Sequence, residues 1–267
     1  MKFLSYKILF LILVLSILGS LILKENSKKI NLDLKFKGPS FEHPLGTDEL
    51  GRDIFLRTIT ALGNSSLIVL IASFISIFFG ILIGGITGIS ENKKIKYIFE
   101  NTFNLLWALP GIPFFVAILT YFPRNIFSVA IAISTLAWIV PARTLRFIIE
   151  SEKRKLYVLA LKSFGYSKLD LIKFIIYNIK EPVILSILFT FIDILVTELS
   201  LSFLGLSIQP PEPSLGSMIY NSINYLNKSI FLFIAPFGAL IFLLISLFSI
   251  INEIQKSKYN IFQEFML

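Results

Sequence analysis

The stretch LIVLIASFISIFFGILIGGITGI, residues 67–89, contains 23 residues and no charged side chain. A helix rises about 1.5 Å per residue, so a run of this length crosses the roughly 30 Å hydrocarbon core of a bilayer. The whole chain has the same character, because 55% of its 267 residues are hydrophobic and only 16% are charged, against about 25% charged in soluble domains. The mean hydropathy is +0.79. The sequence therefore predicts an integral membrane protein.

Five further apolar runs approach the same length, and each ends at charges or at Pro, Gly or Asn. They cover about residues 8–23, 102–122, 126–142, 183–205 and 230–251. We therefore predict an all-α polytopic membrane protein with six transmembrane helices, forming a single transmembrane domain over residues 1–267. The first run could instead be a cleaved signal peptide, but no A-x-A-like site follows its apolar core.

Basic residues predict the orientation. If the N-terminus lies in the cytoplasm, 16 of the 25 Lys and Arg residues fall in inside segments and nine fall outside. The strongest single marker is the short loop with Lys93, Lys94 and Lys96, since short loops follow the positive-inside rule best. Both termini and residues 143–180 are thus predicted to be cytoplasmic. The net charge of +8 follows mainly from topology, so we expect no binding to nucleic acid.

Several classes of chemistry are excluded by composition. The chain has no Cys and one His, His43, which excludes disulfides, thiolate sites and a His-based metal site. It has no GxxxxGK[ST] phosphate loop and no plausible Ser/His/Asp or paired-carboxylate site. We expect a protein that is not an enzyme and holds neither a cofactor nor a metal.

Two of the runs carry unusual backbone residues. The run at 67–89 has a glycine at every fourth position, Gly80, Gly84 and Gly88, which lets another helix approach closely; a hinge is the alternative. The run at 102–122 is interrupted by Pro110, Gly111 and Pro113. Such a kink persists in lipid only where neighbouring helices or a water-lined cavity satisfy the freed carbonyls, which suggests a transport path.

Two carboxylates, Asp193 and Glu198, lie in the fifth run. A charge near the bilayer centre costs several kcal/mol unless it is paired or hydrated, so both are predicted to face the bundle interior or a pore. Glu198 can share a helix face with Ser202. Each carboxylate could make a structural bond between helices or, as a weaker alternative, take part in a proton relay.

The segment at 143–180 is too polar to enter the bilayer. It contains two helical stretches, residues 145–164 and 168–179, separated by Gly165. Glycine permits the left-handed turn that ends a helix. The apolar residues of this segment need a covering partner, or else the segment is an amphipathic helix on the membrane surface.

Two motifs carry a family resemblance. EHPLGTDELGRDI (42–54) and ELSLSFLGLSIQPPEPSLGSM (198–218) closely resemble the inner-membrane permeases of bacterial ABC importers of the dipeptide, oligopeptide and nickel class, specifically the subunit with the HPLGTDxxGRD segment. ALPGIPFF (108–115) is similar to the family's kinked third span. Trp138 and the PAR sequence at 141–143 resemble the exit from its fourth span.

The resemblance implies that residues 151–177 form the EAA-type coupling loop, which docks on a cytoplasmic ATPase. Its implied contact residues are Leu156, Tyr157, Val158, Leu159, Ala160 and Gly165. The usual Glu of this motif is replaced by Leu159, so we expect an interface held mainly by apolar burial and by turn geometry.

The family also implies partners: a second permease subunit, two ATPase subunits and an extracytoplasmic substrate-binding protein. A contact with the binding protein is implied for the outer motifs, at His43, Gly46, Thr47, Asp48, Gly51, Arg52, Asp53, Gln209 and Pro210; a self-satisfied turn is the alternative. The predicted function is half of an ATP-driven import path for peptides or a related small solute across the bacterial inner membrane. The alternatives are import of nickel or a metal chelate and, less favoured, a secondary transporter.

Overall fold

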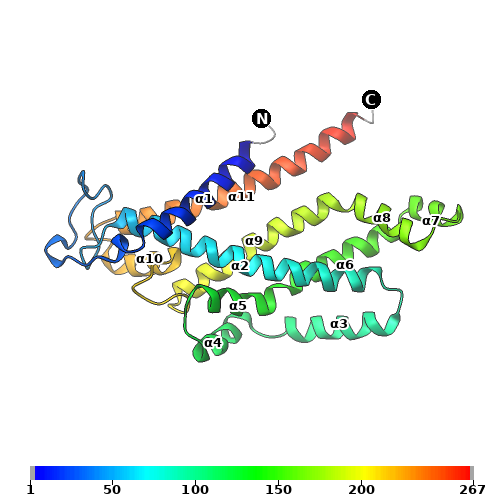
Figure 1. Ribbon diagram of the computed structural model, residues 1–267, viewed down its shortest axis with the longest axis horizontal. Coiled ribbons are helices and arrows are strands. Elements are labelled where there is room, and N and C mark those ends of the chain that lie inside the picture. Colours follow the sequence, from blue (N-terminus) through cyan, green and yellow to red (C-terminus); the bar gives the residue numbers. More distant parts are fainter. Residues whose placement is uncertain (1–3, 265–267) are drawn as a thin grey trace.

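The computed structural model in Figure 1 describes residues 4–264, and side chains from residue 14 to residue 256. Within these residues the regular structure is helical, and Thr47 and Asp53 form only an isolated β-bridge. The α-helices are α1 (Leu4–Leu23), α2 (Ile54–Ile89), α3 (Lys93–Trp107), α4 (Gly111–Tyr121), α5 (Ile126–Ala137), α6 (Ile139–Lys153), α7 (Leu156–Ser163), α8 (Lys168–Asn178), α9 (Lys180–Phe203), α10 (Leu215–Ser222) and α11 (Phe231–Glu264). Short 3₁₀ turns lie at Asn26–Lys28, Leu32–Leu34 and Ile223–Tyr225.

Four helical stretches are long and apolar enough to cross a membrane. They are Ile54–Ile89, Ile126–Lys153, Lys180–Phe203 and Phe231–Lys256. The pair α3 and α4 gives a fifth candidate, bent by 82°. The apolar part of α1 with described side chains, Val14–Leu23, is shorter than a full span. An all-helical polytopic protein with four or five candidate spans is thus present, whereas the count of six remains a prediction.

The bend between α3 and α4 is sharper than the kink expected from sequence. Pro110 is extended, with φ −69° and ψ 109°, and it precedes the first residue of α4. A proline disfavours helical geometry in the residue before it and lacks a backbone donor, so the helix ends there and a new one begins. The expected single span at 102–122 is therefore two helices.

Other helix boundaries also differ from the sequence prediction. The run expected at 126–142 is divided into α5, which ends at Ala137, and α6, which continues to Lys153. The second run was expected from residue 67, but α2 begins at Ile54, where the Asp53 side chain accepts a hydrogen bond from the backbone of Leu56 (2.9 Å). The stretch 145–164 was predicted as one helix, and this was wrong: α6 ends at Lys153 and α7 begins at Leu156. No glycine or proline marks this break in the sequence. A hydrogen bond between the two helices, described below, accompanies it instead.

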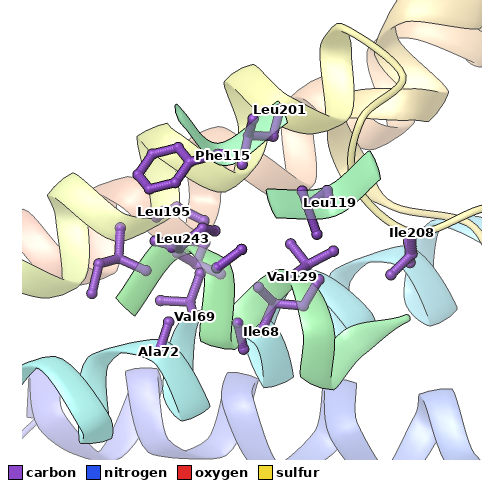
Figure 2. Packing of buried hydrophobic residues seen from close by; sticks show 14 of the residues in the cluster. Ile68, Val69, Ala72, Phe115, Leu119, Val129, Leu195, Leu201, Ile208 and Leu243 are labelled. Atoms are coloured by element: carbon purple, nitrogen blue, oxygen red, sulfur yellow. The ribbon is translucent and has the colours of Figure 1, made fainter. Parts of the chain in front are cut away.

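Helix α2 is the centre of the bundle and packs against α1, α5, α6, α9 and α11. Figure 2 shows its buried residues Ile68, Val69 and Ala72 against Val129 of α5 and Leu195 of α9. All five side chains are at most 6% exposed. This apolar cluster holds the middle of the molecule together and leaves the functional segments at the two ends.

The glycine stripe of α2 faces α6. A Cβ atom built on Gly84 would lie 2.5 Å from the carbonyl oxygen of Ala142, and one on Gly80 would lie 2.7 Å from Cγ of Pro141. On Gly88 it would lie 3.0 Å from Ile149. Only glycine permits this approach of the two backbones, so the stripe is a packing surface, as the sequence predicted.

Candidate functional site

The chain places its candidate functional residues at the two ends of the bundle. One end, the loop end, carries residues 24–53, the loop 204–214 and helix α10; the other, the hairpin end, carries α7 and α8 (Figure 1). Helices α1 and α11 pack against each other, and the start of α1 and the end of α11 point the same way in Figure 1.

At the loop end, the residues of the HPLGTDELGRD motif form one compact turn. Gly46 and Gly51 both take positive φ, at 79° and 70°. Asp48, which is 3% exposed, accepts hydrogen bonds from its neighbours' backbone and from Nε of Arg52 at 2.7 Å. Arg57 of α2 approaches the same carboxylate at 3.3 Å. The charged side chains of the motif are thus paired with one another, and the contact with Arg57 anchors the loop to α2.

His43 belongs to the same turn. Its Nδ1 lies 2.7 Å from the Asp53 carboxylate, whose other oxygen caps α2 through the backbone of Leu56. Thr47 donates to the carbonyl of Leu34 and accepts from the backbone of Lys37. One short motif therefore fixes both the start of α2 and the path of the preceding loop.

The second motif, residues 198–218, closes over α2. Glu198 is fully buried and accepts hydrogen bonds from Ser202 (2.6 Å) and Ser207 (3.3 Å). Asn64 of α2 donates to the carbonyl of Pro213 at 2.8 Å. Burial of Glu198 beside polar groups of this segment is what the sequence predicted, because an unpartnered carboxylate would be too costly there.

At the loop end, an ion-pair clasp joins the segment after α1 to the loop 204–214. The Glu212 carboxylate lies 2.8 Å from Lys28 and 3.0 Å from Lys24. Burial opposes ionisation of Glu212, but the hydrogen bonds from Lys28 and Lys24 outweigh it and lower the pKa of Glu212. The hydrogen bond to Glu212 in turn raises the pKa of Lys28. Nearby, Gln209 and Pro210 remain exposed on the surface.

At the hairpin end, α7 and α8 are joined by Gly165, whose φ of +81° is the left-handed conformation expected from sequence. The backbone of Tyr166 bonds to the carbonyl of Leu161 at 3.2 Å. The Ser167 side chain accepts from the backbone of Asp170 and caps α8. Helices α7 and α8 thus form a helical hairpin that turns at Gly165.

The hairpin is fastened to α6 by a polar network that sequence analysis did not identify. The Tyr157 hydroxyl donates to Glu152 of α6 at 2.7 Å and accepts from Asn178 of α8 at 3.0 Å. Burial and the hydrogen bond to Glu152 raise the pKa of Tyr157. This contact turns the chain at residues 154–155, and a polar residue five positions before a Tyr was its only sequence signal.

The predicted coupling residues divide between two faces of the hairpin. Val158 is buried against Ile149 and Ile175, whereas Leu156, Leu159 and Ala160 are exposed. Leu156 and Phe164 are 84% and 80% exposed, respectively. Apolar residues so exposed along α7 and at its end form a surface without a partner in the described part of the chain.

Asp193 and Glu198 lie on different sides of α9. Both were expected to face the bundle interior or a pore; Glu198 is buried inside this chain, whereas Asp193 is exposed, and its position facing a pore stays a prediction. The two residues are five positions apart, about 140° around the helix, so one helix face cannot bury both.

A second ion network, also missed from sequence, joins α3 to α6. Glu150 lies 2.8 Å from Lys96 and 3.4 Å from Arg146, which also approaches Glu100 at 3.3 Å. The spacing of Arg146 and Glu150 at i and i+4 was a signal, but their partners on α3 are about 50 residues away in sequence.

The fold and its ends define a class: an all-helical, multi-pass membrane component that has a tightly bonded loop end and an apolar hairpin at the other end. Residues 76–260 match the model of the family described as "Binding-protein-dependent transport system inner membrane component". This region is more than half of the chain, and it includes the hairpin and the whole of the second motif. The chain belongs to this family of inner-membrane transport components.

Named relatives agree with this assignment. The chain is 30% identical over 212 residues to the oligopeptide transport system permease protein OppC of Bacillus subtilis, covering 79% of this chain and 69% of that protein. It is 29% identical over 212 residues to the dipeptide permease DppC of the same organism, covering 79% and 66%. It is 32% identical over 186 residues to the di/tripeptide permease DppC of Pseudomonas aeruginosa, covering 69% and 61%.

Proposed function

We propose that this chain is the permease subunit of an ATP-driven importer and forms half of a path for peptides or a related small solute. The observation that carries the proposal is the family match over residues 76–260, together with relatives named as oligopeptide and dipeptide permeases. The chain has no phosphate-binding loop of its own, so ATP hydrolysis belongs to partner subunits.

The proposed topology has six spans in the bacterial inner membrane, with both termini and the α7–α8 hairpin in the cytoplasm. Its support is the excess of basic residues near the hairpin end, where Lys93, Lys94, Lys96, Arg143 and Arg146 lie. The bent pair α3 and α4 counts as the third span and α1 as the first. Both outer motifs then face outward.

The hairpin is the proposed docking element for an ATPase subunit. Its exposed apolar residues Leu156, Leu159 and Phe164 need a protein partner in an aqueous compartment. The network of Tyr157 with Glu152 fixes the hairpin to α6, so a force applied to the hairpin passes to the bundle. We therefore assign coupling to the surface from Leu156 to Gly165.

The outer motifs are assigned to two tasks. The charges of Asp48, Arg52 and Asp53 are bonded within the chain, which supports a role in shaping the loop. Gln209 and Pro210 are exposed, which supports contact with an extracytoplasmic binding protein. A second permease subunit of the same family completes the path in this proposal.

The proposal is tested by co-expressing the chain with the products of adjacent transporter genes. We expect the chain to co-purify with a second permease and two ATPase subunits. In proteoliposomes, a cognate binding protein loaded with peptide should stimulate ATP hydrolysis and peptide uptake. Purification of the chain as a stable unit without ATPase subunits, with solute uptake driven by an ion gradient, would instead establish a secondary transporter.

A further inference from the structure

The exposed face of α9 carries an acidic side chain among apolar ones, and an acidic side chain is costly in lipid. Phe189, Asp193, Val196 and Phe203 follow one another at helical spacing and are all exposed. Asp193 is the fourteenth of 24 residues in α9, about 20 Å from its first residue. It is therefore close to the middle of a membrane-spanning helix.

The carboxylate of Asp193 has no hydrogen-bond or ion-pair partner among the side chains described for residues 14–256; only its backbone carbonyl accepts a hydrogen bond. A carboxylate at the bilayer centre costs at least about 2.5 kcal/mol in lipid. The face of α9 that carries Asp193 therefore does not face acyl chains. It needs water, a solute or a donor group opposite it.

The hydroxyl groups beside Asp193 determine which groups this face accepts. Thr197 donates its hydroxyl hydrogen to the carbonyl of Asp193 at 2.9 Å, and Ser200 donates to the carbonyl of Val196 at 2.8 Å. With these hydrogens engaged in the helix, the two oxygens present lone pairs outward. Together with the carboxylate they form a surface that accepts hydrogen bonds but does not donate them.

We infer that this face of α9, defined by Phe189, Asp193, Val196, Thr197 and Ser200, is a wall of the translocation path and that Asp193 attracts protonated amines of the solute. The inference rests on the proposed function, because it takes the solute to be a peptide or another small amine. An acceptor-only surface in a narrow aqueous path favours cations and ammonium groups. The path thus selects solutes by charge, in addition to the selection made by a binding protein.

The test uses the natural absence of cysteine from the chain. Val196→Cys serves as a reporter beside Asp193, and Leu195→Cys serves as a control, because Leu195 is 1% exposed on the packed side of α9. Assembled transporter in membranes is treated with a cationic or an anionic methanethiosulfonate reagent, which reacts with thiols in water. We expect the reporter to react much faster than the control, and faster with the cationic reagent.

The second arm adds Asp193→Asn to the reporter. The ratio of cationic to anionic labelling rates should fall roughly tenfold, since a unit charge about 6 Å away in water changes each rate about threefold, in opposite directions. Asp193→Glu should keep the original ratio. An unreactive reporter would show that another helix or lipid covers this face, and an unchanged ratio would show that Asp193 does not act on solute charge; either result overturns the inference.

Uptake separates this inference from the proposed function. In the wild-type complex, uptake of dilysine and diglutamate is measured with the same binding protein. Asp193→Asn should lower the ratio of dilysine to diglutamate uptake several-fold, and an unchanged ratio counts against the inference. Absence of ATP-driven peptide uptake in the wild-type complex would refute the proposed function, whereas the labelling rates would still decide whether α9 lines an aqueous path.

Discussion

Gly84→Ala should destabilise the contact of α2 with α6, whereas Gly85→Ala should not. The added Cβ at position 84 would lie 2.5 Å from the carbonyl oxygen and 3.0 Å from Cα of Ala142. These are backbone atoms that no rotamer change can move. At Gly85, one position away on the same helix, an added Cβ meets nothing within 4 Å. The two substitutions have the same chemistry and differ only in packing.

The expected magnitude combines two opposing effects. Replacing a helical glycine by alanine stabilises a helix by about 0.5–1 kcal/mol, and both variants receive this gain. Overpacking a tight contact costs typically about 1–3 kcal/mol, and only Gly84→Ala incurs it. We therefore expect Gly84→Ala to be less stable than Gly85→Ala by about 1–3 kcal/mol.

The measurement is the temperature at which detergent-solubilised complex loses its assembled peak in size-exclusion chromatography, with wild type alongside. Gly84→Ala should lose assembly at a lower temperature, and Gly85→Ala should match or exceed wild type. If both variants keep full stability but both lose transport, the glycines act as a hinge and the packing argument is wrong. Equal stability of the two variants with normal transport would also refute it.

Three further outcomes are expected. Gly165→Val should abolish ATPase co-purification because the left-handed φ of +81° costs a β-branched residue about 1–3 kcal/mol, whereas Gly165→Asn should retain binding; equal binding by both variants would leave the hairpin without a coupling role. Glu198→Leu should lower the yield of assembled complex by leaving the buried Ser202 and Ser207 without their acceptor, and Glu198→Gln should restore part of it; a normal yield for the Leu variant would contradict a required bond. Because the pKa of Glu212 is lowered, the clasp should protect the loop end from proteolysis above the ordinary Glu value of 4.5 and lose that protection as pH falls through the lower folded value. Glu212→Gln should remove this pH dependence, and protection that stays the same in the variant would show that the clasp contributes nothing.

Local patterns were enough for much of the fold and for part of the site. The uncharged run at 67–89 predicted α2 as a span, and Pro110 predicted a kink, although not its sharpness, because each is a property of a few neighbouring residues. Gly165 likewise predicted its turn. For the motif at 42–54 a self-satisfied turn was one of two alternatives. Asp48 does bond to Arg52 within the motif, and Arg57 of the following helix, which the sequence did not identify, approaches the same carboxylate.

The remaining features depend on contacts between segments far apart in the sequence. The division of 145–164 into α6 and α7 accompanies the bonds of Tyr157 with Glu152 and with Asn178. The spacing of Glu152 and Tyr157 is the only local signal of it, and Asn178 lies 21 residues after Tyr157. The exposure of Asp193 follows from which side of α9 packs on α2. Periodicity gives the faces of a helix but does not say which face meets the rest of the chain.

The Tyr157 network, together with a contact of α6 with α2, supports the proposal that the hairpin and the bundle move as one body. Lys153, the last residue of α6, donates to the carbonyls of Gly88 (3.0 Å) and Ile89 (2.7 Å) at the end of α2, so it satisfies orphan carbonyls of that helix. Toward the middle of the bundle, the glycine stripe packs the same two helices together. Toward the hairpin, the Tyr157 hydroxyl bonds α7 to Glu152 of α6. We therefore expect a displacement of the hairpin to carry α6 and α2 with it. Since α9 packs against both of these helices, we expect the displacement to reach the face that bears Asp193 as well.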